Sequence, residues 1–255
     1  MKTETDSRGP GMLSWELQTS AGLPALRLDE GEVAIWCASL EPGDVWLERF
    51  REVLSPDEVE RASRFRFAKH RMRFIASRGI LRHLIASSTG RKPEAVKFAY
   101  GTHGKPSVDG EIRFNMSDSG PVAVYAIGLG REIGIDIEQV RSIRDAGALA
   151  RRFFSPREAE TILRTETDRE SAFFTCWTRK EAYIKARGEG LSMPLHTFEV
   201  SIDPSERPRL VSASIDPREV TRWSMDAFSP LPGYVAAIVT EGRATLRHYS
   251  VRYER

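Results

Sequence analysis

The chain has 255 residues, of which 40% are hydrophobic and 29% are charged, and its formal net charge is +2. This length allows one or two domains, and 12 Phe and 5 Trp can build a packed core, which excludes a wholly disordered protein. No run reaches the roughly 18 apolar residues that a membrane-spanning helix needs. Residues 1–12 are expected to be a flexible polar tail without a signal-peptide core, so we expect a cytoplasmic protein.

Strand and helix signals alternate along the first half of the chain. Residues 32–38 have the apolar, β-prone composition of a strand. A helix is expected to start at Ser55, an N-cap residue that is followed by Pro56 in the first turn and Glu58 at the capping-box position. An apolar stripe predicts a second helix, and the remaining strands follow it. These elements are the helix at 69–88, the strands at 95–100, 112–116, 122–129 and 132–138, and a Gly- and Pro-rich loop at 101–110.

The second half repeats this order. Helices are expected near 146–154, 156–163 and 170–187, and the C-terminal third alternates apolar runs with turns, which predicts a small antiparallel sheet. The order of strand, helices and strands therefore occurs twice, with a seam between about Ser119 and Gly130. We predict an α+β fold of two similar-sized α/β subdomains, at residues 13–120 and 121–255, with a ligand site in the cleft between them.

The two cysteines, Cys37 and Cys176, are too few for a disulfide framework or a cysteine-rich zinc site. Each is expected to be a small buried apolar residue. The five histidines are scattered without an HExxH pattern, so zinc chemistry based on histidine is not expected.

The charges are unevenly distributed despite the low net charge. Residues 61–92 contain no Asp or Glu, and a field of one sign favours an anionic partner. Nucleic acid, a phosphate-bearing cofactor and an acidic protein are all candidates, and a solvated helix face is the alternative. The basic residues of this segment are Arg61, Arg64, Arg66, Lys69, Arg71, Arg73, Arg78, Arg82, Arg91 and Lys92.

The segment EIGIDIE at residues 132–138 is the strongest local signal. In a strand, its three isoleucines lie on one face, and Asp136 and Glu138 lie on the other. Two carboxylates two residues apart on one face repel each other unless a cation lies between them. Oxygen ligands without His or Cys suit Mg2+, whereas the alternative is a solvent-facing strand end with hydrated acids.

A second signal is the helical segment FFTCWTRKEAYIK at residues 173–185. Glu181 falls on its apolar stripe, between Trp177 and Ile184. A carboxylate in that position costs free energy unless it is paired or binds a metal. Lys185 could pair with it, and an ordinary surface Glu–Lys pair is the alternative.

A third signal is the loop GKP at 104–106 followed by FNMSDSG at 114–120. This is a plausible phosphate cradle, although turn chemistry explains its Gly and Pro equally well. The glycine spacings of a dinucleotide fold, of a nucleoside-triphosphatase phosphate loop and of a serine-hydrolase elbow are absent from the sequence.

Taken together, GKP, FNxS, GxDIE, FFSxxE and WxxKEAxxK, in that order, resemble the surfactin-type (Sfp-like) 4′-phosphopantetheinyl transferases. The resemblance covers about residues 32–249, and the pairing of GIDIE with WTRKEAYIK is highly specific. It implies two similar α/β subdomains with coenzyme A bound between them. It also implies transfer of phosphopantetheine to a serine of an apo acyl or peptidyl carrier protein, with Mg2+ or Mn2+, and release of 3′,5′-ADP.

The resemblance also implies roles for individual residues. Asp136, Glu138 and Glu181 would hold the metal, and Glu181 would be the base, helped by Lys185. Glu158 is a further candidate for the metal site. The residues implied to contact coenzyme A are Arg61, Arg73, Lys105, Pro106, Asn115, Ser117, Asp118 and Lys185, with Arg61 and Arg73 at its 3′-phosphate.

One position departs from the family pattern. The residue after the serine of FNxS is usually His in the family and is Asp118 here. An acid beside a phosphate is unfavourable unless it is aimed elsewhere or reaches the metal, so both readings of Asp118 stay open.

Two other functions are weighed against the transferase. One is a relative that binds coenzyme A but has lost activity through Asp118. The other is a nucleic-acid binder that uses residues 61–92, which leaves the three acids unexplained. We expect a monomer that binds neither nucleic acid nor membranes, and fatty-acid, polyketide and nonribosomal-peptide carriers are all possible partners.

Overall fold

The computed structural model describes residues 13–17, 26–165 and 168–253, so the expected tail at residues 1–12 lies outside the described residues. The strands are β1 Leu13–Leu17, β2 Glu32–Ser39, β3 Ala99–Tyr100, β4 Pro106–Ser107, β5 Ile112–Ser119, β6 Val122–Leu129, β7 Ile133–Gln139, β8 Phe198–Val200, β9 Leu210–Ala213, β10 Trp223–Phe228, β11 Tyr234–Glu241 and β12 Thr245–Tyr253. The helices are α1 Asp44–Glu52, α2 Pro56–Ser63, α3 Ala68–Thr89, α4 Ala146–Phe153, α5 Pro156–Arg164, α6 Arg169–Arg187 and α7 Glu219–Arg222.

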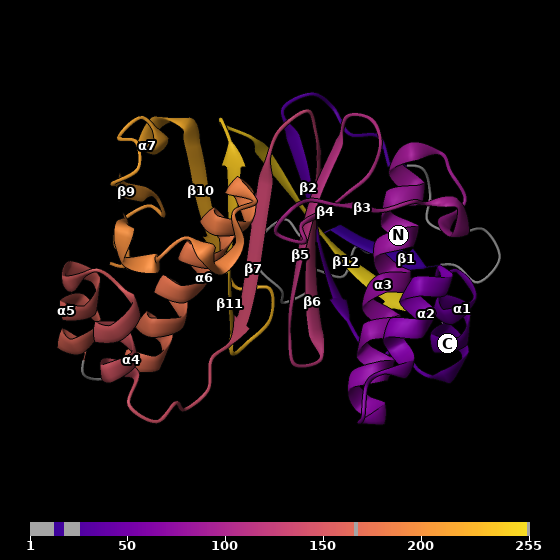
Figure 1. Ribbon diagram of the computed structural model, residues 1–255, viewed down its shortest axis with the longest axis horizontal. Helices are drawn as coiled ribbons and strands as arrows, with labels where there is room; N and C mark the ends of the chain where they lie inside the picture. The colour runs from indigo at the N-terminus through magenta and orange to yellow at the C-terminus, as the bar shows by residue number, and fades with distance from the viewer. Residues whose placement is uncertain (1–12, 18–25, 166–167, 254–255) are drawn as a thin grey trace, which may run out of the picture.

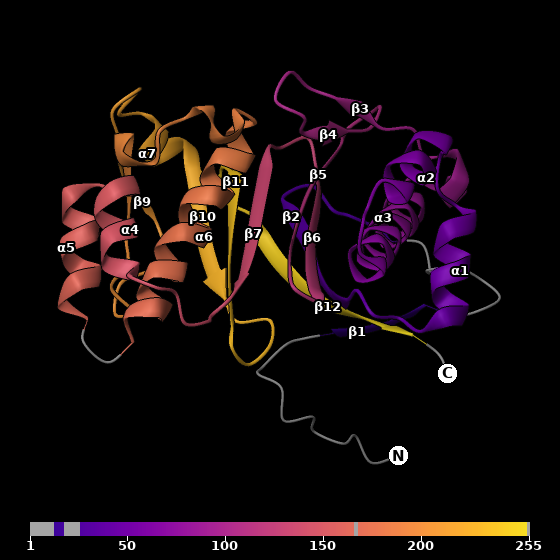
Figure 2. The same ribbon diagram turned by 60° about the horizontal axis from the view of Figure 1, so that its bottom comes forward.

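Two larger sheets form the centre of the molecule, and helices cover their outer faces (Figure 1). The five-stranded sheet has the order β1-β12-β2-β6-β5, and the three-stranded sheet has the order β10-β11-β7. Helices α1 to α3 lie on one side of the molecule and α4 to α6 on the other, as a second view also shows (Figure 2). The predicted α+β class is confirmed. Among the described helices, none is both long and apolar enough to cross a membrane.

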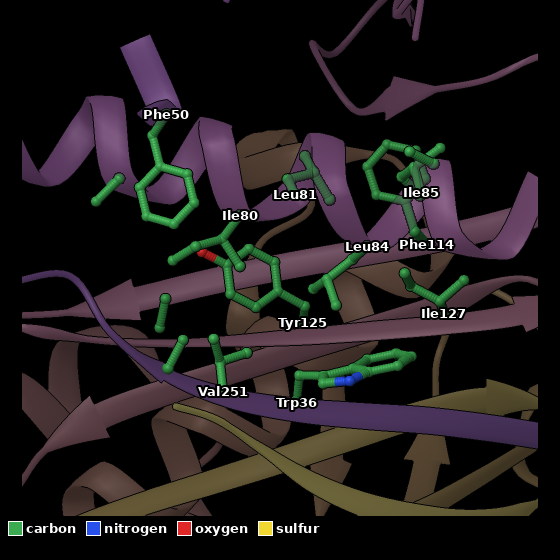
Figure 3. Packing of buried hydrophobic residues seen from close by; sticks show 14 of the residues in the cluster. Trp36, Phe50, Ile80, Leu81, Leu84, Ile85, Phe114, Tyr125, Ile127 and Val251 are labelled. Carbon is green, nitrogen blue, oxygen red and sulfur yellow. The ribbon is translucent and has the colours of Figure 1, made fainter. Parts of the chain in front are cut away.

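The core against the five-stranded sheet is built by α3 (Figure 3). Ile80, Leu81, Leu84 and Ile85 from α3 are fully buried, and they pack with residues of the sheet such as Trp36. The periodic stripe on α3 therefore predicted both the helix and its buried face correctly.

A second core fills the space between the two sheets. The three isoleucines of β7, Ile133, Ile135 and Ile137, are at most 1% exposed and pack with residues of β2, β6 and β11. The predicted alternation along this strand is confirmed, and it turns Asp136 and Glu138 toward the opposite face, which α6 covers.

Most elements begin and end close to their predicted limits, and two expectations were wrong. Residues 95–100 were expected to form a strand, but Pro93–Ala95 form a 3-10 turn and only Ala99–Tyr100 are extended. The C-terminal third does not form one antiparallel sheet. Strands β10 and β11 form the three-stranded sheet with β7, and β8 pairs with β9. Strand β12 lies parallel to β2 in the five-stranded sheet. Alternation identifies a strand but not its partner, because pairing is decided by distant contacts.

The pairing of the strands shows where the chain passes between the two large sheets, near the seam that we expected between the two halves. β6, from Val122, pairs with β2 and β5, whereas β7, from Ile133, pairs with β11. The chain therefore passes from one large sheet to the other around Gly130, and β12 returns to the first sheet. The proposed division into residues 13–120 and 121–255 stays a prediction about domains.

Candidate active site

β5 and β7 meet at the junction between the two large sheets, although in the described strands neither is the other's ladder partner. Asn115, Ser117 and Ser119 lie on one face of β5, because side chains alternate along a strand. Asn115 Oδ1 accepts the Ile135 N–H at 2.9 Å, and Ser119 Oγ accepts the Gln139 N–H at 3.1 Å. Side chains of β5 therefore satisfy main-chain groups of β7 that no neighbouring strand pairs.

A cluster of charged and hydroxyl groups occupies the middle of this junction. Ser117 Oγ donates to Asp136 Oδ1 at 2.7 Å. Lys185 Nζ, from α6, donates to Asp136 Oδ1 at 2.7 Å and to Ser117 Oγ at 2.9 Å. The Asp136 side chain is 6% exposed and that of Lys185 is 26% exposed, so the pair is enclosed but open on one side. The structure thus brings three predicted residues together from three elements.

Two further carboxylates face this cluster. Ser119 Oγ donates to Glu138 Oε2 at 2.8 Å. Burial raises the pKa of Glu138; the Ser119 hydroxyl opposes this shift, and the charge of Asp136 adds to it. Burial also raises the pKa of Glu181 to about 7, with Asp136 and Glu138 raising it further and Lys185 lowering it. These three carboxylates therefore interact electrostatically across β7 and α6.

The carboxylates suit a hard cation. Asp136 Oδ2 and Glu181 Oε1 are buried without a hydrogen-bond partner, and buried oxygens of this kind cost free energy until they find one. In the described part of the chain, no three acidic, His or Cys side chains are already gathered around one point. Mg2+ normally takes only one or two protein carboxylates and completes its shell with water and phosphate, so the two unpartnered oxygens fit it.

Gly134 brings α6 directly onto β7. A Cβ at this position would lie 2.0 Å from the Ala182 carbonyl oxygen and 2.2 Å from the Ala186 nitrogen, so only glycine allows the helix backbone this close. The close approach places Lys185 within hydrogen-bond distance of Asp136. The glycine of GxDIE therefore has a packing role that sets the geometry of the site.

Lys105 lies on the loop before β4, and its ammonium is already engaged. Nζ donates to Glu132 Oε2 at 2.8 Å, to the Ile133 carbonyl at 3.1 Å and to the Ala186 carbonyl at 3.1 Å. Pro106, which follows it, starts β4 and pairs with Tyr100. The predicted contact between Lys105 and a phosphate stays a prediction.

Asp118 lies on the opposite side of β5 from Ser117, the side that Phe114 and Met116 turn toward the core beneath α3. Asp118 is an exposed residue. Partial removal of its carboxyl from water nevertheless raises the pKa of that group, and the charge of Asp136 raises it further, whereas the charges of Lys185 and Arg73 lower it. Arg73 itself pairs with Glu41, with Nη2 and Oε1 2.7 Å apart. This placement favours the reading in which Asp118 is a substitution beside the site and not a metal ligand.

The acid-free segment is partly neutralised by acids from outside it. Arg78 and Arg82 are buried and donate to both oxygens of Glu58 at 2.7 and 2.6 Å, and Arg64 pairs with Glu60. The predicted one-signed field is therefore weaker than the sequence suggested. Arg61 lies over the Phe74 ring and lines a cavity of about 250 Å³ together with Asp57, Glu58, Phe74, Arg78 and Tyr100.

Glu158, the further candidate for the metal site, caps the N-terminus of α5 instead. Its two oxygens accept from Ser155 N–H at 2.9 Å, Val200 N–H at 2.8 Å and Lys180 Nζ at 2.7 Å. These partners belong to the N-cap of α5, to β8 and to α6, so both carboxylate oxygens are already satisfied. The sequence interpretation missed Lys180, which is fully buried, and Ser119, which period-two alternation from Ser117 could have identified.

Comparisons with known proteins agree with the pattern of the site. The protein-family model described as "4'-phosphopantetheinyl transferase superfamily" matches residues 132–239. A second family model, described as "4'-phosphopantetheinyl transferase, N-terminal", matches residues 39–128. The chain is 38% identical to 4′-phosphopantetheinyl transferase HetI of Nostoc, over 86% of this chain and 92% of that protein. The chain belongs to the 4′-phosphopantetheinyl transferase family. It is also 29% identical to 4′-phosphopantetheinyl transferase Sfp of Bacillus subtilis, over 75% of this chain and 84% of that protein. The predicted resemblance is confirmed.

Proposed function

We propose that this protein transfers the 4′-phosphopantetheine group of coenzyme A to a serine hydroxyl of an apo acyl or peptidyl carrier protein and releases 3′,5′-ADP. The observation that carries the proposal is the cluster of Asp136, Ser117 and Lys185, faced by Glu138 and Glu181, in a chain of the 4′-phosphopantetheinyl transferase family.

Asp136, Glu138 and Glu181 would hold Mg2+ or Mn2+. The support is their mutual repulsion and the two buried oxygens without a partner, Asp136 Oδ2 and Glu181 Oε1. A cation bound there would neutralise charge on the pyrophosphate of coenzyme A, which is worth several kcal/mol in phosphoryl transfer.

Glu181 is the proposed general base. The carrier serine oxygen forms a bond to the β-phosphorus of the pyrophosphate, the bond from that phosphorus to the leaving 3′,5′-ADP breaks, and the serine proton passes to the Glu181 carboxylate. Without a cation, burial and the two neighbouring acids raise the pKa of Glu181 to about 7; a bound cation would lower it and keep the carboxylate ionised, ready to accept the serine proton. Asp136 and Ser117 hold the Lys185 ammonium, which would stabilise the negative charge of the leaving group.

The binding site for coenzyme A belongs to the same proposal. Arg61 and Arg73 would contact the 3′-phosphate, with Arg61 lining the cavity beside α2. Pro106, Asn115, Ser117, Asp118 and Lys185 would line the rest of the site. Asn115 and Ser117 are held by partners on β7, so any contact they make with the ligand would start from fixed side chains.

The test is incubation of the protein with coenzyme A, Mg2+ and an apo carrier protein, followed by mass spectrometry of the carrier. We expect a gain of one phosphopantetheine group, loss of the reaction in excess chelator, and a fall of about 10²-fold or more for Asp136→Ala. Asp109→Ala, an exposed loop residue, is the control and should keep full activity. Full activity in excess chelator would contradict the metal assignment.

A relative that binds coenzyme A without transferring its arm is the second candidate, since Asp118 departs from the family pattern. If no carrier gains mass, titration calorimetry with coenzyme A separates this candidate from a protein that does not bind the cofactor. The monomeric state and the cytoplasmic location stay predictions from the sequence.

A further inference from the structure

The Lys105 side chain has no donor to spare. A lysine ammonium has three N–H donors, and three acceptors lie within 3.1 Å of Nζ: Glu132 Oε2, the Ile133 carbonyl and the Ala186 carbonyl. Its side chain is 20% exposed. A phosphate could bind this ammonium only by displacing one of these acceptors.

The two carbonyls belong to the elements that carry the site. Ala186 is in the last turn of α6, where carbonyls have no partner within the helix and a cation is favoured by the helix dipole. Ile133 is the first residue of β7. Ala186 follows Lys185 directly, and Ile133 is three residues before Asp136, so one ammonium ties together both backbones that position the Lys185–Asp136 pair.

The loop that carries Lys105 is closed on itself and rests on the end of α6. Gly101 N–H donates to the Lys105 carbonyl at 3.0 Å, and Gly104 adopts a φ of 78°, which glycine tolerates. On the other side, a Cβ at Gly188 would lie 3.5 Å from Lys105 Cδ, which is ordinary contact distance. The loop and the turn after α6 therefore pack against each other.

We propose that Lys105 is a positioning residue. With Glu132 as its counter-ion, it fastens the loop at residues 101–106 to the end of α6 and the start of β7, and so keeps Lys185 and Asp136 within hydrogen-bond distance. Arg113 Nε, 3.6 Å from Glu132 Oε1, holds the counter-ion from its other side. The effect on turnover rests on the proposed transferase function, whereas the effect on local opening does not.

The first experiment measures local opening without any substrate. Amide hydrogen exchange of residues 101–105 and 184–190 is compared between the wild type and Lys105→Met. Lys105→Met removes charge-assisted hydrogen bonds to three acceptors, so exchange in both segments should be faster by about tenfold or more. Lys105→Arg, which keeps the charge, should restore part of the protection. Lys97→Met, an exposed lysine in the same half, should leave both segments unchanged. Unchanged exchange in Lys105→Met would overturn the proposal.

The second experiment distinguishes a positioning lysine from a phosphate ligand. It removes the charge of Glu132, with which a phosphate would compete for the Lys105 ammonium. If Lys105 mainly binds phosphate, Glu132→Gln frees its ammonium and should tighten coenzyme A binding. If Lys105 positions α6 and β7, Glu132→Gln should speed exchange in the direction of Lys105→Met and lower kcat, with coenzyme A affinity no better than that of the wild type. This variant keeps the test available if Lys105→Met does not fold. Tighter coenzyme A binding in Glu132→Gln with unchanged exchange would overturn the proposal, and a wild type without transferase activity would contradict the proposed function but not the exchange result.

Discussion

The contact between Gly134 and α6 gives the sharpest test of how the site is held. In Gly134→Ala, the new methyl group would start 2.0 Å from the Ala182 carbonyl oxygen and 2.2 Å from the Ala186 nitrogen. Ordinary contact begins near 3.4 Å, so the helix must retreat by about 1.4 Å. Both obstacles are backbone atoms, which cannot rotate away as a side chain could.

Overpacking of this kind costs about 1–3 kcal/mol, and the rigid neighbours place Gly134→Ala near the upper end. The free energy of unfolding should therefore fall by about 3 kcal/mol. The same shift moves Lys185 away from Asp136, whose facing atoms are now 2.7 Å apart. A misplacement of about 1 Å can cost on the order of 10²-fold in rate, so we expect a loss of that size in kcat.

Urea denaturation gives the stability change, and carrier modification followed by mass spectrometry gives the rate. Gly101→Ala is the matched control, since a Cβ there would be 3.8 Å from its nearest neighbour, and both properties should stay near those of the wild type. If Gly134→Ala unfolds at the wild-type urea midpoint and keeps its kcat, then the close approach of α6 to β7 does not position the site.

Three further predictions concern the ligand and the core. Arg61→Ala should weaken coenzyme A binding by about 1.5–3 kcal/mol, and titration calorimetry should show little change with dephospho-coenzyme A, because the contact is to the 3′-phosphate. Asp118→His should tighten coenzyme A binding by about 1 kcal/mol in the same assay, because it removes a negative charge beside the phosphates; weaker binding would refute this reading. Glu58→Gln should lower the free energy of unfolding by about 3–5 kcal/mol at pH 7, because Arg78 and Arg82 lose their buried counter-ion. Burial raises the pKa of Glu58, but these two arginines lower it overall, so the wild type should lose this advantage as the pH falls below about 4.5, and denaturation at several pH values checks it.

The centre of the site could be predicted because two independent periodicities point to it. Alternation along β7 put Asp136 and Glu138 on one face, and the helical stripe put Glu181 toward the core of the same half. They meet because α6 packs on that face of β7, and the spacing along α6 then brings Lys185 to Asp136. Local patterns are sufficient when both partners lie on regular elements that pack directly on each other.

Contacts across long sequence separations could not be predicted in this way. The partners of Arg78 and Arg82 lie 20 and 24 residues earlier, on Glu58, so the acid-free segment looked more strongly charged than it is. Lys105 reaches Ala186 across 81 residues, and the sequence contains no sign that a glycine-rich loop would end on a helix C-terminus. Strand pairing has the same difficulty, since β12 joins β2 from the far end of the chain.

The acids of the interior fall into two groups. Some have hydrogen-bond donors on both oxygens and stabilise the fold, whereas others keep an oxygen that is available for chemistry. α2 and α5 both begin with Ser-Pro-x-Glu, and each glutamate binds the N–H of its N-cap serine and a cation from the helix that follows in the same half. Both oxygens of Glu58 and of Glu158 therefore have partners, and neither can take a metal without breaking a helix start. Among the carboxylates that the structure describes, Asp136 and Glu181 alone have a buried oxygen without a hydrogen-bond partner. A fold tolerates that cost where a ligand removes it, so the buried oxygens without a partner point to two of the three residues that the family pattern implies as metal ligands.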